Sequence, residues 1–216
     1  MSFYRIPFST LMVGVLIIAG CDSAGDNVED EPEPALKIRL VGQLSILNEN
    51  PNAIHSDVWG YVDANTSKEY ALIGGLGQGT RVMHIVDVSD PAVPVLTASI
   101  DVPGFDMKVW QHYAYTVTGG GDQRGNQPDG RIIDLSDPAN PVVVGVFPSA
   151  HNIFIDDQGF LYLESPGLHI MDLNLDPTNP LLLWSDGTQN GHDATVIVGS
   201  ARPNPCGSRS PMPSWS

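Results

Sequence analysis

Three histidines in this chain stand beside polar side chains in arrangements that could bind a metal ion. The three pairs are His55 with Asp57, His151 with Asn152, and His192 with Asp193. Imidazole nitrogens and carboxylate oxygens are ligands that zinc and other transition metals accept. The pairs therefore form one candidate binding site, whose cofactor would be a divalent metal, with His151 and His192 as candidate ligands.

The same histidines also have a structural interpretation, in which each ring bonds a neighbouring loop and fixes the position of a strand. His55, His151 and His192 are separated by 96 and 41 residues, and the chain contains no HExxH sequence. Such spacings match no metal-binding motif. They favour the structural interpretation, and the two interpretations predict different metal contents for the purified protein.

A glycine-rich loop offers a second set of oxygen ligands. Asp122, Asn126 and Asp129 lie between Gly119 and Gly130, and such oxygens suit calcium. Their spacing does not match the EF-hand pattern, which favours a hairpin loop. No GxSxG motif surrounds any serine, and no cysteine falls in a segment expected to be ordered. The sequence therefore indicates no catalytic residue and favours a protein that is not an enzyme.

One phrase occurs three times and predicts the elements that carry these side chains. The copies IVDVSDP, IIDLSDP and IMDLNLDP share Asp87, Asp134 and Asp172, which are 47 and 38 residues apart. A period of about 40–50 residues with about four strands is typical of β-propeller blades. Aspartate followed by proline suits a type I turn. The phrase should therefore be the turn that leads into the last strand of each blade.

The predicted fold is all-β, a β-propeller-type repeat of four-stranded blades in an open or incomplete propeller. We expect three complete blades plus partial strands at Lys37–Leu47 and His192–Val198. Each blade should begin with its innermost strand, and the starts of these strands should meet at one mouth of a central channel. That convergence would bring the histidine pairs together.

The N-terminal residues 1–20 have the pattern of a lipoprotein signal peptide. Arg5 precedes an apolar run that ends in Ile-Ala-Gly-Cys, which resembles the bacterial lipobox. Cys21 is the predicted lipidation site, through which acyl chains would anchor the protein to a membrane. Residues 21–35 are acidic and contain two prolines, so we expect them to form a disordered tether.

The charge of the chain argues against one class of partner. The 216 residues carry a net charge of −15 and include only 10 Lys and Arg residues. Binding to nucleic acid requires clustered basic side chains that neutralise phosphates. We therefore expect no nucleic-acid partner.

The phrases IVDVSDPAVPV and IIDLSDPANPV resemble LVIVD repeats. With HNIFIDDQGFLY and GHDAT, they follow the order found in the choice-of-anchor B family of bacterial surface proteins, over residues 56–198. The resemblance implies a propeller-like repeat region at 36–200 that an anchor attaches to the cell surface. Full members of that family continue into further blades, whereas residues 201–216 look like a disordered or aberrant tail, so we expect a truncated chain.

These features predict an exported, lipid-anchored repeat protein of the bacterial cell envelope, located outside the cytoplasm. Its expected role is that of a non-catalytic binding or scaffolding module for a surface protein or a glycan, with the membrane contacted through the N-terminal lipid. The alternative is a metal-binding protein or a hydrolase-type enzyme that uses the histidines at the channel mouth. The fold alone does not decide between them, because propellers host both classes.

Overall fold

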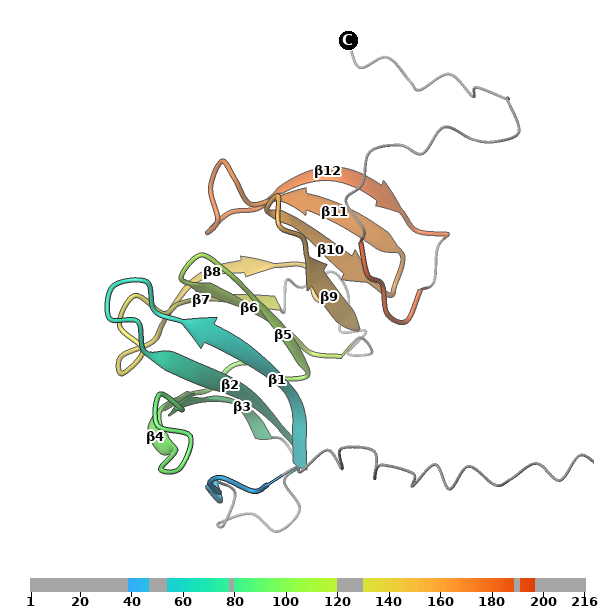
Figure 1. The fold of residues 1–216 in the computed structure, drawn as a ribbon. Helices are drawn as coiled ribbons and strands as arrows, with labels where there is room; N and C mark the ends of the chain where they lie inside the picture. Colours follow the sequence, from blue (N-terminus) through green and yellow to red (C-terminus); the bar gives the residue numbers. More distant parts are fainter. Residues whose placement is uncertain (1–38, 47–53, 78–79, 120–129, 189–190, 197–216) are drawn as a thin grey trace, which may run out of the picture. The chain divides into compact units, whose positions relative to one another are not determined.

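The computed structural model describes residues 39–46, 54–77, 80–119, 130–188 and 191–196. The described residues from Leu40 onward belong to one compact unit. None of the described residues is helical, and their strands form three antiparallel sheets of four strands each (Figure 1). The prediction of an all-β fold with three complete four-stranded repeats is confirmed.

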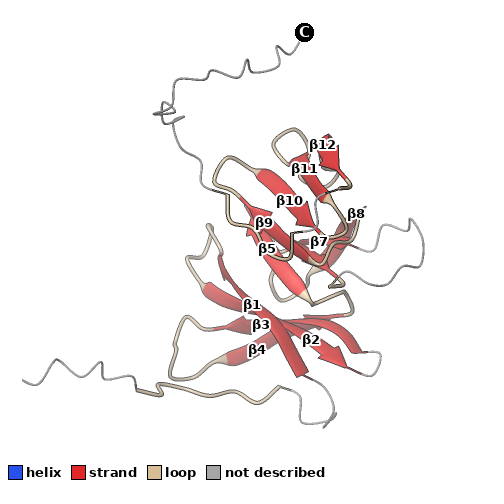
Figure 2. Cartoon of the chain, turned by 90° about the vertical axis from the view of Figure 1, so that its right-hand side faces the viewer, coloured by secondary structure: helices blue, strands red, loops and turns tan. Residues whose placement is uncertain are grey.

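Each sheet contains four strands that are consecutive in the sequence and paired in that order. Figure 2 shows the strands in red after a quarter turn from the view of Figure 1. The first sheet contains β1 (Ile54–Val62), β2 (Glu69–Gly77), β3 (Thr80–Asp87) and β4 (Val95–Ile100). The second contains β5 (Asp106–Trp110), β6 (Tyr113–Val117), β7 (Gly130–Asp134) and β8 (Val142–Phe147). The third contains β9 (Asn152–Ile155), β10 (Phe160–Glu164), β11 (Leu168–Asp172) and β12 (Leu181–Asp186).

Two layers of buried side chains hold the three sheets together. The layer between the first and second sheets includes Leu72 and Ile133, and the layer between the second and third includes Leu163. Ala114 and Tyr115 are neighbours in β6 but belong to different layers, because successive side chains of a strand point to opposite faces. The middle sheet therefore contributes buried side chains from both faces, mainly from β5 to β7, whereas β8 is largely exposed. The first strands β1, β5 and β9 lie side by side.

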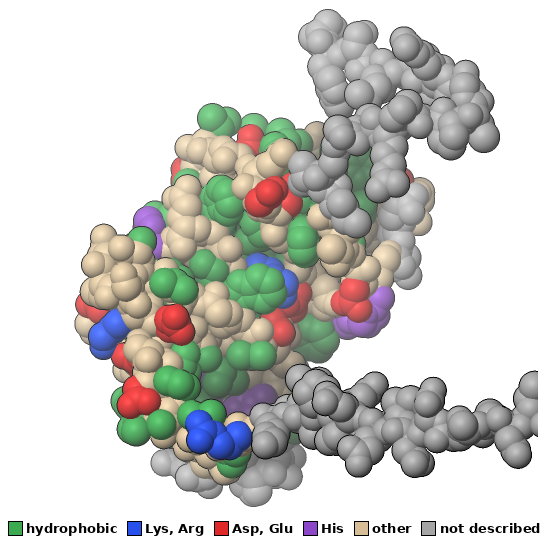
Figure 3. All heavy atoms as spheres, in the orientation of Figure 1, with side chains coloured by type: hydrophobic (Ala, Val, Ile, Leu, Met, Phe, Trp, Pro, Cys, Tyr) green, Lys and Arg blue, Asp and Glu red, His purple; other side chains and the backbone are tan. Residues whose placement is uncertain are grey.

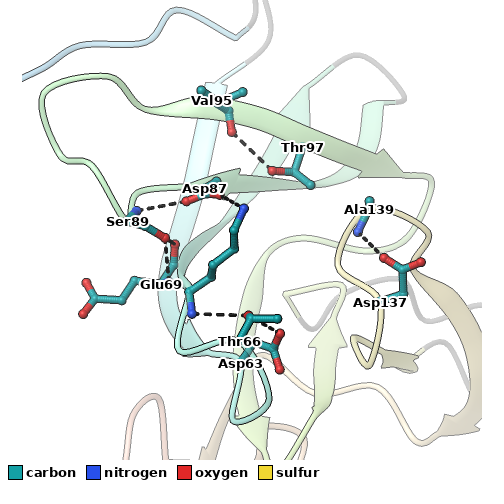
Figure 4. A network of polar contacts seen from close by, with 10 residues as sticks. Asp63, Thr66, Glu69, Asp87, Ser89, Val95, Thr97, Asp137 and Ala139 are labelled. Carbon is teal, nitrogen blue, oxygen red and sulfur yellow. Dashed lines mark hydrogen bonds and ion pairs between the residues drawn. The ribbon is translucent and has the colours of Figure 1, made fainter.

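The repeated phrase forms the same turn three times, as the sequence predicts. The Oδ1 atoms of Asp90, Asp137 and Asp176 accept the amide two residues later, at 3.0, 3.1 and 2.9 Å. Their carbonyls accept the amide three residues later. Figure 4 shows the Asp137 turn together with Asp87, whose carboxylate accepts the amide of Ser89. Hydrogen bonds from Ser89 are the largest cause that lowers the pKa of Asp87 to about 2.

The strand pairing is irregular at the same position in every sheet. The break between the third and fourth strands lies at Ile85/Val86, Ile132/Ile133 and Ile170/Met171. In each case it comes directly before the shared aspartate of the repeated phrase. A bulge bends and twists the bulged strand, so the recurrence indicates that the three sheets are built to one plan.

The two predicted partial strands do not form within the described residues. Residues 39–46 form no strand, and Gly42 lies so close to the Pro91 carbonyl that a Cβ atom there would overlap it. This segment therefore packs on a turn instead of a strand edge. Residues 191–196 form no strand either, because the described residues supply no second strand of a fourth sheet for pairing.

Several predictions about the chain ends concern residues that the structure does not describe. The signal peptide at 1–20, the tether at 21–35, the lipidation site Cys21 and the tail at 201–216 all lie outside the described residues. Within the part that the structure describes, no helix is long and apolar enough to cross a membrane.

Candidate functional site

The first strand of each sheet (β1, β5 and β9) carries equivalent residues in the same register with the second strand of that sheet. Trp59, Lys108 and Phe154 pair with Leu72, Tyr115 and Tyr162 of the adjacent second strands. The residues that come two positions earlier in each first strand are Asp57, Asp106 and Asn152. Each sheet therefore presents an acidic or amide side chain at the same point of its first strand.

These side chains join one sheet to the next. The Asp57 Oδ2 atom accepts the backbone amide of Met107 at 3.1 Å, and the Asp106 Oδ2 atom accepts the amide of Ile153 at 2.7 Å. A first strand lies at the edge of its sheet, so some of its amides point away from the sheet and lack a ladder partner. The aspartate of the preceding sheet supplies that partner, and we call these two contacts the inter-sheet links.

Lys108 is surrounded by the two linking carboxylates and an aromatic ring. Its ammonium bonds Asp106 and lies 3.5 Å from the Asp57 Oδ2 atom. It also lies 4.5 Å from the centre of the Trp59 ring, within the range of a cation–π contact. Even so, the pKa of Asp106 is raised to about 6, first because the carboxyl is buried and second because of hydrogen bonding to Asp57.

The raised pKa predicts that Asp106 makes the protein less stable as the pH increases. Such a carboxyl binds its proton more tightly in the folded state. Its contribution to the free energy of unfolding is fully present below about pH 4 and is lost as the pH rises through about 6. The loss is at most about 3 kcal/mol. Denaturant unfolding at pH 4 and pH 7 should show a larger decrease for the wild type than for Asp106→Asn. Equal decreases in both proteins would contradict this prediction.

The ends of the first strands open into a pocket of about 650 Å³. Its lining includes the charged residues Asp57, Asp106, Lys108, Glu164 and Asp193, the rings of Trp59, Phe105, Phe154, His151 and His192, and the polar Asn152. Figure 3 shows one face of the molecule, on which acidic, basic and histidine side chains lie among hydrophobic ones. A pocket that combines aromatic surface with a few convergent polar groups is the usual form of a ligand site.

Glu164 is the least satisfied charged residue of this pocket. The residue is 2% exposed, and neither carboxylate oxygen has a hydrogen-bond partner among the described residues. Burial is the first cause that raises its pKa, and the charges of Asp193 and Asp106 are the next. The backbone amide of Ala194 approaches the carboxyl as a hydrogen-bond donor, outside the geometry of a full hydrogen bond, and together with the charge of Lys108 it lowers the pKa without offsetting these effects. A buried carboxyl whose oxygens are not fully hydrogen-bonded is costly.

The structure brings two of the three predicted histidines together. The Nε2 atoms of His151 and His192 are 2.7 Å apart, and the His192 Nδ1 atom lies 2.9 Å from the Asp193 carboxylate. His55 lies apart from them and close to His84. The pKa of His84 is lowered, first by burial and second by the charge of His55. Counted back from Trp59 and Phe154, which stand at the same level, Ser56 and not His55 is the residue equivalent to His151.

The predicted histidine ligands lie within the described residues, whereas the predicted ligands of the glycine-rich loop do not. Among the described residues, no group of three or more His, Cys, Asp or Glu side chains is placed to hold a metal ion. The ring nitrogens of His151 and His192 contact each other, the Gly119 carbonyl and Asp193, and none of these partners is a hydroxyl or thiol. The loop residues Asp122, Asn126 and Asp129 lie outside the described residues.

The sequence analysis missed three charged residues that the structure places in the pocket. They are Asp106, Lys108 and Glu164. Asp106 had a visible signal, because it stands at the position of Asp57 and Asn152 once the three repeats are aligned. Glu164 had none, because the equivalent residues of the other sheets are Gly74 and Val117.

Comparison with known proteins agrees with the repeated architecture. A search of curated proteins finds no match to the chain. The family model of the LVIVD repeat matches residues 69–102 and 130–148. The first match covers β2 to β4, and the second covers β7 and β8. The LVIVD repeat model therefore matches the last three strands of the first sheet and the last two strands of the second.

Proposed function

We propose that this chain is an exported, lipid-anchored protein of the bacterial cell envelope whose stacked repeats act as a non-catalytic binding module. Two observations support the surface location. The LVIVD repeats suggest a surface repeat module, and the resemblance to choice-of-anchor B proteins suggests that an anchor accompanies it. The lipobox-like sequence that ends at Cys21 is that anchor.

The observation that carries the binding role is the buried carboxyl of Glu164 in the pocket of the first strands. Its oxygens have no hydrogen-bond partner among the residues that the structure describes, although nearly all buried polar groups of folded proteins have one. A ligand that donates hydrogen bonds would supply the missing partner. The pocket thus contains a buried acceptor that the described part of the fold does not fully satisfy.

A glycan is the ligand class that fits the remaining lining best. Sugar hydroxyls donate hydrogen bonds to carboxylates, and their C–H faces pack on aromatic rings. Trp59 supplies such a ring and is 37% exposed, while Glu164 and Asp193 supply acceptors on the same pocket. The proposed role is therefore recognition of an envelope glycan without chemical change to it.

The experiment is a calorimetric titration of soluble envelope oligosaccharides into the full-length chain. We expect at least one to bind, with the affinity reduced at least 10-fold by Trp59→Ala and by Glu164→Gln. Trp184→Ala is the matched control, because Trp184 is 40% exposed and lies in β12, outside the pocket lining. Binding that all three variants retain, or the appearance of a cleaved product by mass spectrometry, would contradict the proposal.

A further inference from the structure

Contacts of its ring and of its backbone hold His151 in one orientation. Its Nδ1 atom lies 2.6 Å from the Gly119 carbonyl oxygen, and its backbone amide donates to the carbonyls of Glu164 and Ser165 at 2.8 Å each. Phe105 packs on the ring with 4.9 Å between the ring centres. Because a carbonyl only accepts hydrogen bonds, Nδ1 carries the proton, and the Nε2 atom of the neutral ring presents a lone pair.

The same reasoning applies to His192. Its Nδ1 atom lies 2.9 Å from the Asp193 carboxylate, which also only accepts, so Nδ1 again carries the proton and Nε2 presents a lone pair. The two Nε2 atoms face each other at 2.7 Å. Two lone pairs at this distance repel each other unless a cation lies between them, either a proton or a metal ion.

We propose that the Nε2 atoms of His151 and His192 are the protein ligands of a late first-row divalent metal ion, Zn²⁺ or Cu²⁺. Metal-binding histidines usually donate the other ring N–H to a carbonyl or a carboxylate, which orients the ring and makes the ligand more basic. Gly119 and Asp193 occupy these two positions here. Imidazole nitrogens select these ions over Ca²⁺ and Mg²⁺, which prefer oxygen.

The geometry requires only a small adjustment to admit the ion. Two nitrogens bound to a tetrahedral zinc at about 2.0–2.1 Å lie about 3.4 Å apart, so the rings must separate by less than about 1 Å. The side chain of His192 is 74% exposed and has room to move. With two protein ligands, water completes the coordination sphere, and the site keeps open positions.

The test uses the untagged full-length chain, treated with chelator and then titrated with ZnCl₂ and with CuSO₄ by calorimetry. We expect one ion per chain, with coupling to two nitrogens in the electron paramagnetic resonance spectrum of the copper form. His192→Ala should weaken binding at least 10-fold. Asp193→Asn, which changes a positioning residue, should weaken it about 10–100-fold. His112→Asn is the control, because that exposed histidine contacts Asp134 and Tyr113, and it should bind as the wild type does.

The outcomes separate the metal from the proton. The proposal is overturned if the wild type binds the metal no more tightly than His192→Ala does. It is also overturned if the copper spectrum lacks two nitrogen couplings. Either result would show that the rings share only a proton. The copper spectrum of the wild type is decisive even if a variant fails to fold. The glycan titration is made with the metal-free protein, so failure of the metal site and failure of the proposed binding role are distinguishable.

Discussion

Replacing Asp106 with alanine is expected to lower the free energy of unfolding by about 3 kcal/mol, measured by denaturant titration. The change removes the acceptor of the Ile153 amide, which is 2.7 Å from the carboxylate. Ile153 is 3% exposed, so water cannot replace that acceptor without opening the interface of the second and third sheets. Lys108 also loses one of its two carboxylate partners.

Two control variants separate the inter-sheet link from the general effect of losing an aspartate. Asp106→Asn keeps one side-chain oxygen that can accept the Ile153 amide, so the loss should be smaller. Asp137→Ala removes an exposed turn carboxylate, and the loss there should be about 1 kcal/mol. If Asp106→Ala lowers the stability no more than Asp137→Ala does, the link does not hold the sheets together.

Replacing Cys21 with serine is expected to move the protein from the membrane fraction to the soluble fraction. A serine cannot receive the acyl chains of the lipobox pathway, and acyl chains contribute about 0.8 kcal/mol of membrane affinity per buried methylene. Their loss should therefore abolish anchoring. The measurement is fractionation of cells that express the chain, with metabolic labelling by a fatty acid.

Ser23→Ala is the matched control for this change, because it lies two residues after Cys21 and leaves the lipobox-like sequence intact. It should remain labelled and in the membrane fraction. Retention of the Cys21→Ser protein on membranes without any acyl label would show that another feature anchors the chain.

The sequence predicted the features that each repeat builds from its own residues. The turns at Asp90, Asp137 and Asp176 form as expected, because an aspartate that accepts a nearby amide needs only local geometry. The strand order inside each sheet follows for the same reason. Short apolar runs joined by tight turns pair with their neighbours in the sequence.

The sequence did not predict the features that arise between repeats. The inter-sheet link of Asp106 joins residues 47 positions apart, and the pKa of Glu164 is raised by burial and by the charges of Asp193 and Asp106, which lie far from it in the sequence. The predicted meeting of three histidines is reduced to two, because Ser56 and not His55 is equivalent to His151 when the repeats are aligned on Trp59 and Phe154. This alignment depends on the pairing of the first and second strands, which the histidine pairs in the sequence do not reveal.

The central claim is that aspartates of the first strands join successive sheets and so position the pocket. Amide hydrogen exchange at Ile153 tests it most directly. In the wild type this amide should exchange as slowly as the ladder amides of β6, and in Asp106→Ala it should exchange much faster while the β6 amides stay protected. If the Ile153 amide of the wild type exchanges as fast as the exposed turn amide of Ala139, the claim is contradicted.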